Sequence, residues 1–147
     1  MAGGRHMLTD SEILRRAQRR ATFRVVPTAD WRALLRRRTN LLVSGPAEAL
    51  TAFVQMARSE MLEPIRSAAS VLPQALDGAR TLILTDVGAL DGHNQQRLIG
   101  WLDELENREI QIVSLTSVPL FSLVERNAFD ARLYYRLNTI FLEIDAA

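Results

Sequence analysis

The chain alternates short apolar runs with segments of helical periodicity, and this alternation limits the folds that it can adopt. Apolar runs bounded by turn residues predict buried strands at 40–45, 64–70, 80–87, 108–117 and 138–144. Apolar residues at helical spacing predict helices at 11–21, 31–38, 47–62, 92–108, 118–129 and 130–137. Strands that alternate with helices favour right-handed crossovers. We therefore expect an α/β fold in three layers, with a parallel sheet of about five strands and helices on both faces.

Residue types that are absent from the sequence exclude several kinds of site. The 147 residues contain no cysteine, which excludes disulfides and zinc–thiolate sites and makes a reducing cytoplasm the expected compartment. All 18 basic residues are arginine, so no lysine can bind a phosphate or form a Schiff base. His93 has no second histidine or cysteine at ligand spacing, so we expect no metal site there. No apolar run reaches the ~20 residues of a membrane span, so we expect no membrane partner.

Positive charge is concentrated near the N-terminus. Residues 1–40 carry ten arginines and three acidic residues, a net charge of +7, whereas residues 41–147 carry eight arginines and fourteen acidic residues, a net charge of −6. The opening residues 1–7, MAGGRHM, are typical of a cloning remnant that would end at a native Met7. We expect residues 8–39 to form a basic helical segment and residues 40–147 to form the single domain.

Five stretches carry motifs in a fixed order. They are NLLVSGPAEAL (40–50), PIRSAASVLP (64–73), TLILTDVGAL (81–90), REIQIVSLTS (108–117) and FDARLYYRLNTIFLEI (129–144). In this order they resemble the Walker A region, second strand, Walker B strand, sensor I strand and arginine-finger region of the AAA+ core in bacterial sigma-54-dependent activators. Gln95, Leu98 and Leu102 resemble the helix that follows Walker B in that family. The resemblance implies a P-loop type of α/β core.

The groups that bind and hydrolyse ATP in that family are missing from the matching positions. In the Walker A region Ser44 and Gly45 remain, but Pro46 stands where an N–H donor is needed and Glu48 lies near the expected anion. Asp86 and Val87 occupy the Walker B pair, so the second acid, which would polarise the attacking water, is absent. We therefore expect a degenerate core with no catalytic, cofactor-binding or metal-binding residues.

The arginine-finger region is altered as well. Asp130 stands at the first finger position, and only Arg136 remains. Arg136 could act in trans on a competent ATPase, although an intrachain or surface salt bridge is favoured. Asp86 could in principle hold a metal, but with no phosphate or second acid nearby we expect it to cap a turn or to pair with an arginine.

Two segments of the family have no counterpart in this sequence. Between Pro73 and the Walker B strand the family inserts the loop that contacts the sigma factor, but here only QALDGAR (74–80) fills the gap. The family continues after this core into a helical lid and a DNA-binding domain, whereas this sequence ends at Ala147, so we expect no lid. The resemblance therefore does not extend to remodelling of the polymerase.

Two surfaces are candidates for binding a partner. Arg36, Arg37 and Arg38 could neutralise nucleic-acid phosphates without regard to sequence, but a solvated face that complements the acidic core is favoured. Tyr134 and Tyr135 lie in the finger region, which faces a neighbouring subunit in the family. The resemblance thus implies a protein partner at that surface, and a homo-oligomer is a further expectation.

These observations predict a non-catalytic regulatory or protein-interaction module in bacterial signalling or transcriptional control. One alternative is an accessory subunit that keeps residual nucleotide binding or supplies Arg136 in trans. A non-specific nucleic-acid binder is the other alternative. The sequence names neither the partner nor the signal.

Overall fold

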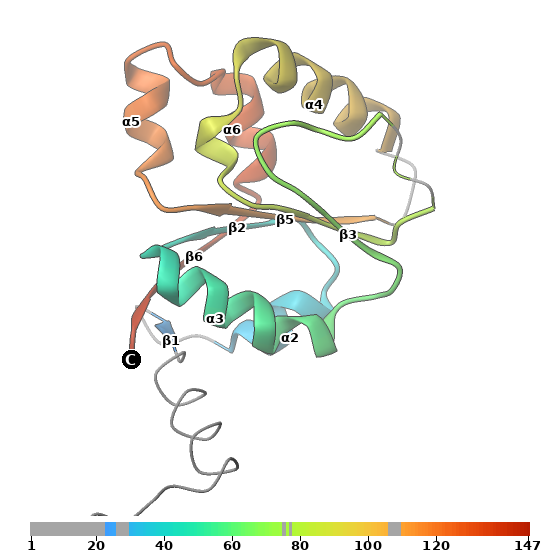
Figure 1. Cartoon of the computed structure of the whole chain (residues 1–147), viewed down its shortest axis with the longest axis vertical. Helices are drawn as coiled ribbons and strands as arrows, with labels where there is room; N and C mark the ends of the chain where they lie inside the picture. The colour runs from blue at the N-terminus through green and yellow to red at the C-terminus, as the bar shows by residue number, and fades with distance from the viewer. Residues whose placement is uncertain (1–22, 26–29, 75, 77, 106–109) are drawn as a thin grey trace, which may run out of the picture.

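The structure, a computed structural model, describes residues 23–25, 30–74, 76, 78–105 and 110–147 (Figure 1). In chain order, with η for 3-10 helices, the elements are β1 (Phe23–Val25), α2 (Trp31–Arg36), β2 (Leu41–Ser44), α3 (Ala47–Ala57), η1 (Arg58–Glu60), β3 (Ile65–Ala68), β4 (Thr81–Leu84), η2 (Val87–Ala89), α4 (Gly92–Leu105), β5 (Gln111–Thr116), α5 (Leu120–Glu125), α6 (Ala131–Leu137) and β6 (Ile140–Ala146). The helix expected at 11–21 lies outside the described residues. Within the described part of the chain, no helix is long and apolar enough to cross a lipid bilayer.

The strands form one six-stranded sheet in the order β1-β6-β2-β5-β4-β3. The five strands from β6 to β3 are parallel, whereas β1 runs antiparallel to β6. The expected parallel sheet with helices on both faces is confirmed, with six strands in place of about five. The added strand β1 lies within residues 8–39, which we expected to be helical. Its three residues are too few for periodicity to reveal a strand.

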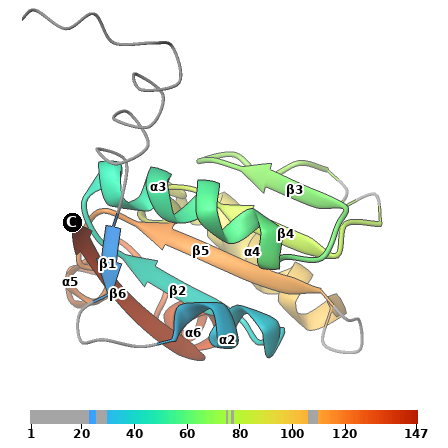
Figure 2. The ribbon, with the colours of Figure 1, turned by 90° about the horizontal axis from the view of Figure 1, so that it is seen from below.

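Helices cover the two faces of the sheet unequally. α2 and α3 lie on one face, and α4, α5 and α6 lie on the other (Figures 1 and 2). The handedness of the crossovers explains why helices lie on both faces. The connection through α3 runs from β2 to β3 in one direction along the sheet, and the connections through the later helices run in the opposite direction, so right-handed crossovers place them on opposite faces. The direction of the connections changes between β2 and β5. In open α/β sheets, ligands bind beyond the carboxyl ends of the strands at such a point.

Alternate residues of the central strands enter two separate hydrophobic clusters. On β2, Val43 packs in the cluster that includes α2 and α3, whereas Leu42 packs in the cluster that includes α4 and α6. In the first cluster Phe23, Trp31 and Phe53 form an aromatic group, with ring centroids 5.3, 5.4 and 5.5 Å apart. Such pairs each contribute about 0.5–1.5 kcal/mol beyond burial. This aromatic group therefore holds β1 and α2 against α3.

Side chains of α4 fasten the segment that joins β3 to β4. The Oδ1 atom of Asn94 accepts a hydrogen bond from the backbone N–H of Leu72 at 3.3 Å. The guanidinium of Arg97 donates to the carbonyls of Leu72 and Pro73 at 3.1 and 2.9 Å. Because the side chain of Leu72 is also buried, this short connection packs against α4.

Candidate functional site

The connection between β2 and α3 decides whether the carboxyl edge of the sheet can hold a phosphate. β2 ends at Ser44 and α3 begins at Ala47, so only Gly45 and Pro46 lie between them. The backbone N–H of Gly45 donates to the carbonyl of Thr116 at 3.1 Å, and proline has no N–H. A phosphate-binding loop surrounds its ligand with free N–H groups. Neither residue of this connection offers one.

Gly45 is held close to the neighbouring strand. A Cβ atom at this position would lie 2.4 Å from the carbonyl oxygen of Ile144 on β6. Only glycine fits without a shift of one backbone or the other. The retained glycine of the Walker A region thus serves the packing of β2 against β6.

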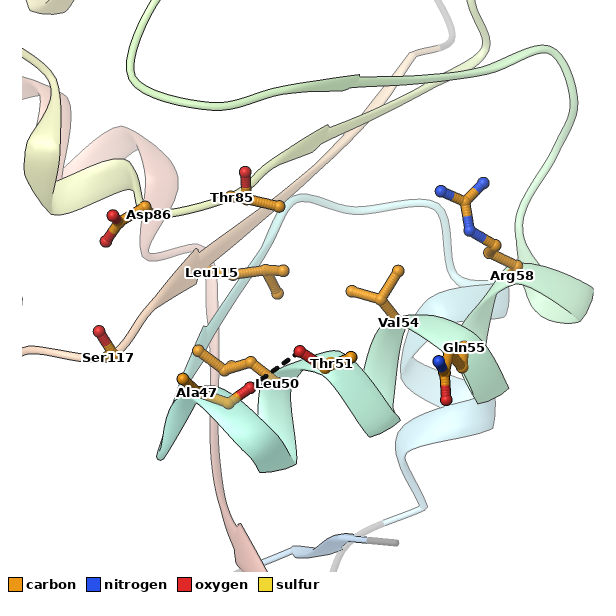
Figure 3. A pocket seen from close by; sticks show the side chains of 10 residues that line it. All are labelled: Ala47, Leu50, Thr51, Val54, Gln55, Arg58, Thr85, Asp86, Leu115 and Ser117. Atoms are coloured by element: carbon orange, nitrogen blue, oxygen red, sulfur yellow. Dashed lines mark hydrogen bonds between the residues drawn. The ribbon is translucent and has the colours of Figure 1, made fainter. Parts of the chain in front are cut away.

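The first turn of α3 carries groups that disfavour an anion. Glu48 is exposed in this turn and places a negative charge at the positive end of the helix dipole. The hydroxyl of Thr51 donates to the carbonyl of Ala47 at 3.1 Å (Figure 3). The Thr51 hydroxyl is therefore already hydrogen-bonded within the helix, and the Glu48 carboxylate would repel a phosphate bound at this end of α3.

The two Walker B positions have separate environments. Val87 is fully buried in the cluster beneath α4, α5 and α6, so it belongs to the core. Asp86 is exposed in the left-handed region, with φ of 57° and ψ of 48°, which aspartate tolerates better than most residues. Its backbone carbonyl accepts from the N–H of Ala89 at 2.9 Å. Its carboxylate makes no hydrogen bond or ion pair with the described residues, so the expected turn cap or arginine partner is not found for the side chain there.

An open pocket of about 470 Å³ lies between α3 and the carboxyl ends of β4 and β5 (Figure 3). Leu50, Val54 and Leu115 line its apolar part. Figure 3 shows Asp86 toward one end and Arg58 toward the other. The pocket lining contains no histidine or cysteine, and its hydroxyl groups belong to Thr51, Thr85 and Ser117. The hydroxyls of Thr51 and Thr85 donate to the carbonyls of Ala47 and Ala68 at 3.1 and 3.2 Å. The pocket is therefore a candidate binding site for a small molecule.

Asp130, at the first finger position, caps α6. Its carboxylate accepts from the backbone N–H of Arg132 at 2.8 Å and pairs with the guanidinium of Arg132 at 3.0 Å. The hydrogen bond from the Arg132 side chain, helped by those from the Arg132 backbone and from Gln96, lowers the pKa of Asp130 to about 2. Aspartate here therefore organises the start of α6 in place of a finger.

Arg136, the remaining finger residue, is held within the chain. Its guanidinium forms a hydrogen-bonded ion pair with Asp103 on α4. A finger has to extend across a subunit boundary to the phosphate of its neighbour. Arg136 would have to leave Asp103 to do so, and the structure thus contains the intrachain salt bridge that the sequence favoured.

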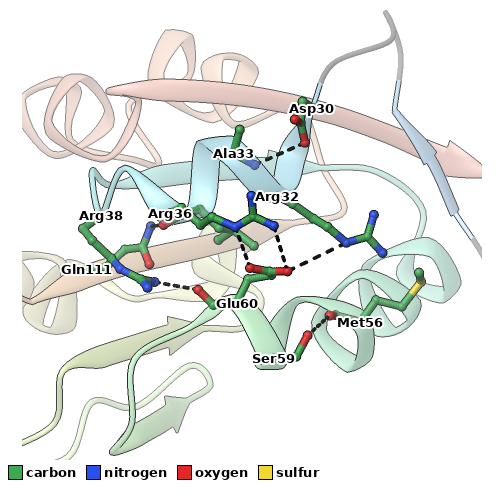
Figure 4. A network of polar contacts seen from close by, with 10 residues as sticks. Asp30, Arg32, Ala33, Arg36, Arg38, Met56, Ser59, Glu60 and Gln111 are labelled. Atoms are coloured by element: carbon green, nitrogen blue, oxygen red, sulfur yellow. Dashed lines mark hydrogen bonds and ion pairs between the residues drawn. The ribbon is translucent and has the colours of Figure 1, made fainter.

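Arginines of α2 and of the turn that follows it surround Glu60 (Figure 4). Arg36 donates to the two Glu60 carboxylate oxygens at 2.9 and 3.3 Å, and Arg32 lies 4.0 Å from one of them. The Arg38 guanidinium donates to the backbone carbonyl of Glu60 at 2.6 Å. The hydrogen bond from Arg36 is the main cause that lowers the pKa of Glu60. The Arg37 side chain makes no hydrogen bond or ion pair with the described residues. Of the predicted interaction residues Arg36, Arg37 and Arg38, it is therefore the one most available to bind a ligand.

The two adjacent tyrosines of α6 have separate roles. Tyr134 is half-buried, its hydroxyl accepts from Asn138 at 3.2 Å, and its ring lies 5.7 Å from that of Phe121. Tyr135 is 66% exposed. Of the two tyrosines, only Tyr135 exposes most of its side chain to solvent.

Sequence reasoning missed the role of Gln95 in positioning the finger region. Its buried amide donates to the carbonyls of Leu90 and Ala128 at 2.8 and 3.1 Å and accepts from the N–H of Asp130 at 2.8 Å. The sequence did hold one signal: Gln95 is a polar residue at a position of α4 that faces the hydrophobic core, and buried polar groups are usually hydrogen-bonded.

The fold is that of the AAA+ class, and the connection between β2 and α3 is a two-residue turn. The sequence matches the model of the family described as the Sigma-54 interaction domain over residues 39–146, and the chain belongs to this family. No curated protein shows significant similarity to the sequence.

Solved structures share the fold at low sequence identity. NtrX from Brucella abortus in complex with ADP aligns with a TM-score of 0.58 and 14% identity, over 95% of this chain and 37% of the NtrX chain. NtrX in complex with ATP gives the same score and identity over 99% and 39% of the two chains. DnaA from Aquifex aeolicus bound to AMPPCP aligns with a TM-score of 0.54 and 13% identity, over 95% and 48%. This chain thus spans less than half the length of each.

Proposed function

We propose that this chain is a non-catalytic regulatory or protein-interaction module of bacterial signalling or transcriptional control, acting in the cytoplasm without ATP. The observation that carries the proposal is the two-residue connection between β2 and α3. Its one N–H group is bonded to Thr116, and its other residue is a proline.

The chemistry of nucleotide binding supports this proposal. A triphosphate requires a loop of N–H donors, a cation at its phosphates and acids for magnesium and the attacking water. The corresponding edge here carries Glu48, Asp86 and the buried Val87. No lysine exists in the chain to compensate for the carboxylates. The absence of all these groups together argues against weak residual ATP hydrolysis as the function of this chain.

The competing proposal is an accessory subunit that supplies Arg136 to the active site of a partner ATPase. The position of Arg136 favours one of the two proposals over the other. Its ion pair with Asp103 must break before it can approach a phosphate of a partner ATPase. An arginine finger increases turnover by 10³–10⁵-fold, so its contribution is easily measured. We therefore place the accessory role second.

Thermal unfolding with ATP and magnesium tests the proposal directly. A ligand at ~100 times its dissociation constant stabilises the folded state by roughly 2.7 kcal/mol. We expect no magnesium-dependent rise in Tm at millimolar ATP. NtrX from Brucella abortus, which has been crystallised with ATP, is the positive control in the same buffer. A clear rise in Tm for this chain, or phosphate release above the blank, would refute the proposal.

A further inference from the structure

The pocket between α3 and the carboxyl ends of β4 and β5, called the α3 pocket below, carries opposite charges at its two ends. Asp86 and Arg58 are the two charged residues of its lining, and Figure 3 shows them toward opposite ends. Both residues are exposed, and neither side chain makes a hydrogen bond or ion pair with the described residues. An anion at one end and a cation at the other are thus both available to a ligand.

Between the two charges the floor of the α3 pocket is apolar. Leu50 and Leu115 line it and are buried in the cluster beneath α3, and the half-buried Val54 packs against that cluster. Because a close-packed core holds these side chains in place, the floor keeps its shape when a ligand enters. The middle of a bound ligand is therefore apolar on the side that meets this floor.

Polar groups along the walls of the α3 pocket suit the backbone of a peptide. Gln55 on α3 and Ser117 after β5 are exposed, and their side chains make no hydrogen bond with the described residues. The hydroxyls of Thr51 and Thr85 donate within the protein, so their oxygens can still accept. Each peptide unit offers one donor and one acceptor, and the Gln55 amide can meet both.

The extent of the α3 pocket sets the length of its ligand. The lining includes Ala47, the first residue of α3, and Arg58, its C-cap. The eleven steps between them, at 1.5 Å each, correspond to ~16 Å of helix. A peptide of three or four extended residues spans ~10–14 Å, and the long side chain of Arg58 can cover the remaining distance.

We propose that the α3 pocket binds a short apolar peptide of three or four residues, with its terminal ammonium at Asp86 and its terminal carboxylate at Arg58. Both ends then form charge-assisted contacts, and the apolar side chains lie on the floor of the pocket. The inference goes beyond the proposed function, because it assigns a small ligand to the module, and it holds whether or not Arg136 serves a partner ATPase.

An NMR titration of the full, isotopically labelled chain with the tripeptide Ala-Val-Leu, both termini free, tests the proposal. The amide signals of Leu50, Val54 and Leu115 should shift together and saturate, with a dissociation constant of ~10⁻⁵–10⁻³ M, as expected for a ligand of this size. The amide of Tyr135, on the opposite face of the sheet, should not shift. Absence of saturable shifts up to ~10 mM peptide overturns the proposal.

Capped peptides show whether the charged ends are used. Acetylation of the N-terminus removes the cation that Asp86 binds, and amidation of the C-terminus removes the anion that Arg58 binds. Each cap should weaken binding about fivefold, the effect of one ion pair at an exposed site. Equal affinities of the free and capped peptides overturn the proposal.

Neutral variants assign each cap to one residue. In Asp86→Asn the free and acetylated peptides should bind equally, while amidation should still weaken binding about fivefold. Arg58→Gln should show the reverse pattern. Asparagine tolerates the left-handed conformation at position 86, and Arg58 is exposed, so both variants should fold. An acetylation effect that persists in Asp86→Asn, or an amidation effect that persists in Arg58→Gln, overturns the proposed orientation and the proposal with it.

Two further variants are matched controls for the loss of charge. Glu143→Gln and Arg37→Gln neutralise exposed side chains that do not line the α3 pocket. Both variants should retain the fivefold effect of each cap on binding. Loss of the acetylation effect in Glu143→Gln, or of the amidation effect in Arg37→Gln, would show that net charge acts in place of the two pocket residues and would overturn the proposal.

A comparison with 8-aminooctanoate separates a peptide from an alkyl zwitterion of similar length. This compound has both charged ends but no peptide groups, so it leaves the Gln55 amide without a partner. It should bind at least about threefold more weakly than the tripeptide, as expected for the loss of a neutral hydrogen bond. Equal binding of the two ligands would assign the pocket to alkyl zwitterions and overturn the peptide as its ligand.

Discussion

At the scale of single residues, polar side chains hold the finger region in place where sequence motifs showed only substitutions. Asp130 looks like the loss of an arginine, yet it caps α6 and holds Arg132. Gln95 links α4 to the start of α6 through the N–H of Asp130. The cap by Asp130 is local to α6, whereas the contact of Gln95 with Asp130 joins residues 35 apart in sequence, so no local pattern could reveal it.

Gln95→Ala tests the buried amide of α4. The substitution leaves the carbonyls of Leu90 and Ala128 and the N–H of Asp130 without this partner. Buried groups without a hydrogen bond cost about 1–3 kcal/mol each, and relaxation or water can recover part of this. We expect the free energy of unfolding to fall by about 2 kcal/mol in urea titrations. The exposed neighbour Gln96→Ala is the control, and an equal loss in both variants would contradict the role of Gln95.

Asp130→Asn tests the charge of the α6 cap. Because the pKa of Asp130 is lowered to about 2 in the folded protein, its carboxylate stabilises the fold above the ordinary aspartate pKa. This stabilisation is lost as the pH falls through that range toward 2. Asparagine can keep the backbone cap but not the pairing with Arg132.

The expected result is a stability difference between wild type and Asp130→Asn at pH 6 that shrinks steadily between about pH 4 and pH 2. Urea unfolding at several pH values measures it, and NMR titration of the carboxyl carbon gives the pKa itself. A difference that stays constant down to pH 2 would show that the charge of Asp130 has no part in it.

At the scale of elements, the connection between β2 and α3 shows how far the sequence determines the site. The apolar run predicted the strand β2, which is confirmed, and the single glycine and Pro46 predict a connection that does not bind phosphate. They could not predict that the Gly45 N–H bonds to Thr116, because that bond depends on the register between β2 and β5. The sequence favoured a salt bridge for Arg136, but it could not identify the partner, Asp103, which lies 33 residues away.

Two glycine substitutions test the packing of this connection. In Gly45→Ala the new Cβ would lie 2.4 Å from the Ile144 carbonyl oxygen, so β2 and β6 must separate. We expect a loss of stability of about 1–3 kcal/mol, as for overpacked cores. Gly100→Ala on α4, where a Cβ meets nothing within 4 Å, should instead stabilise by about 0.5–1 kcal/mol through helix propensity. Thermal and urea unfolding compare the two, and a neutral Gly45→Ala would contradict the close approach.

At the scale of the whole molecule, the strand and helix pattern was predictable because central strands such as β2 and β4 are short, mainly apolar runs between turns. The expected run 64–70 contains β3, and 138–144 contains most of β6. β1 could not be predicted, because three residues carry no periodicity and its strand partner lies at the opposite end of the chain. Distance in sequence also hides the hollow of about 320 Å³ beside Phe121 and Phe141, since its lining comes from five separate elements, β2, β5, α5, α6 and β6.

The concentration of arginines near the N-terminus predicts how strongly and how specifically the molecule binds nucleic acid. Arg32 and Arg36 share the Glu60 carboxylate, whereas Arg37, the C-cap residue of α2, makes no side-chain hydrogen bond or ion pair with the described residues. We expect binding to duplex DNA to be weak, with dissociation constants of about 10⁻⁴–10⁻⁶ M at physiological salt, and indifferent to sequence.

Each phosphate contact adds about 0.9 to the slope of log affinity against log salt, so Arg37→Ala should lower the slope by about that amount and Arg36→Ala by less. Fluorescence anisotropy with two duplexes of equal length and different sequence, at several salt concentrations, measures both effects. Preference for one duplex in competition, or binding that persists at high salt, would show a specific site that the arrangement of these arginines does not provide.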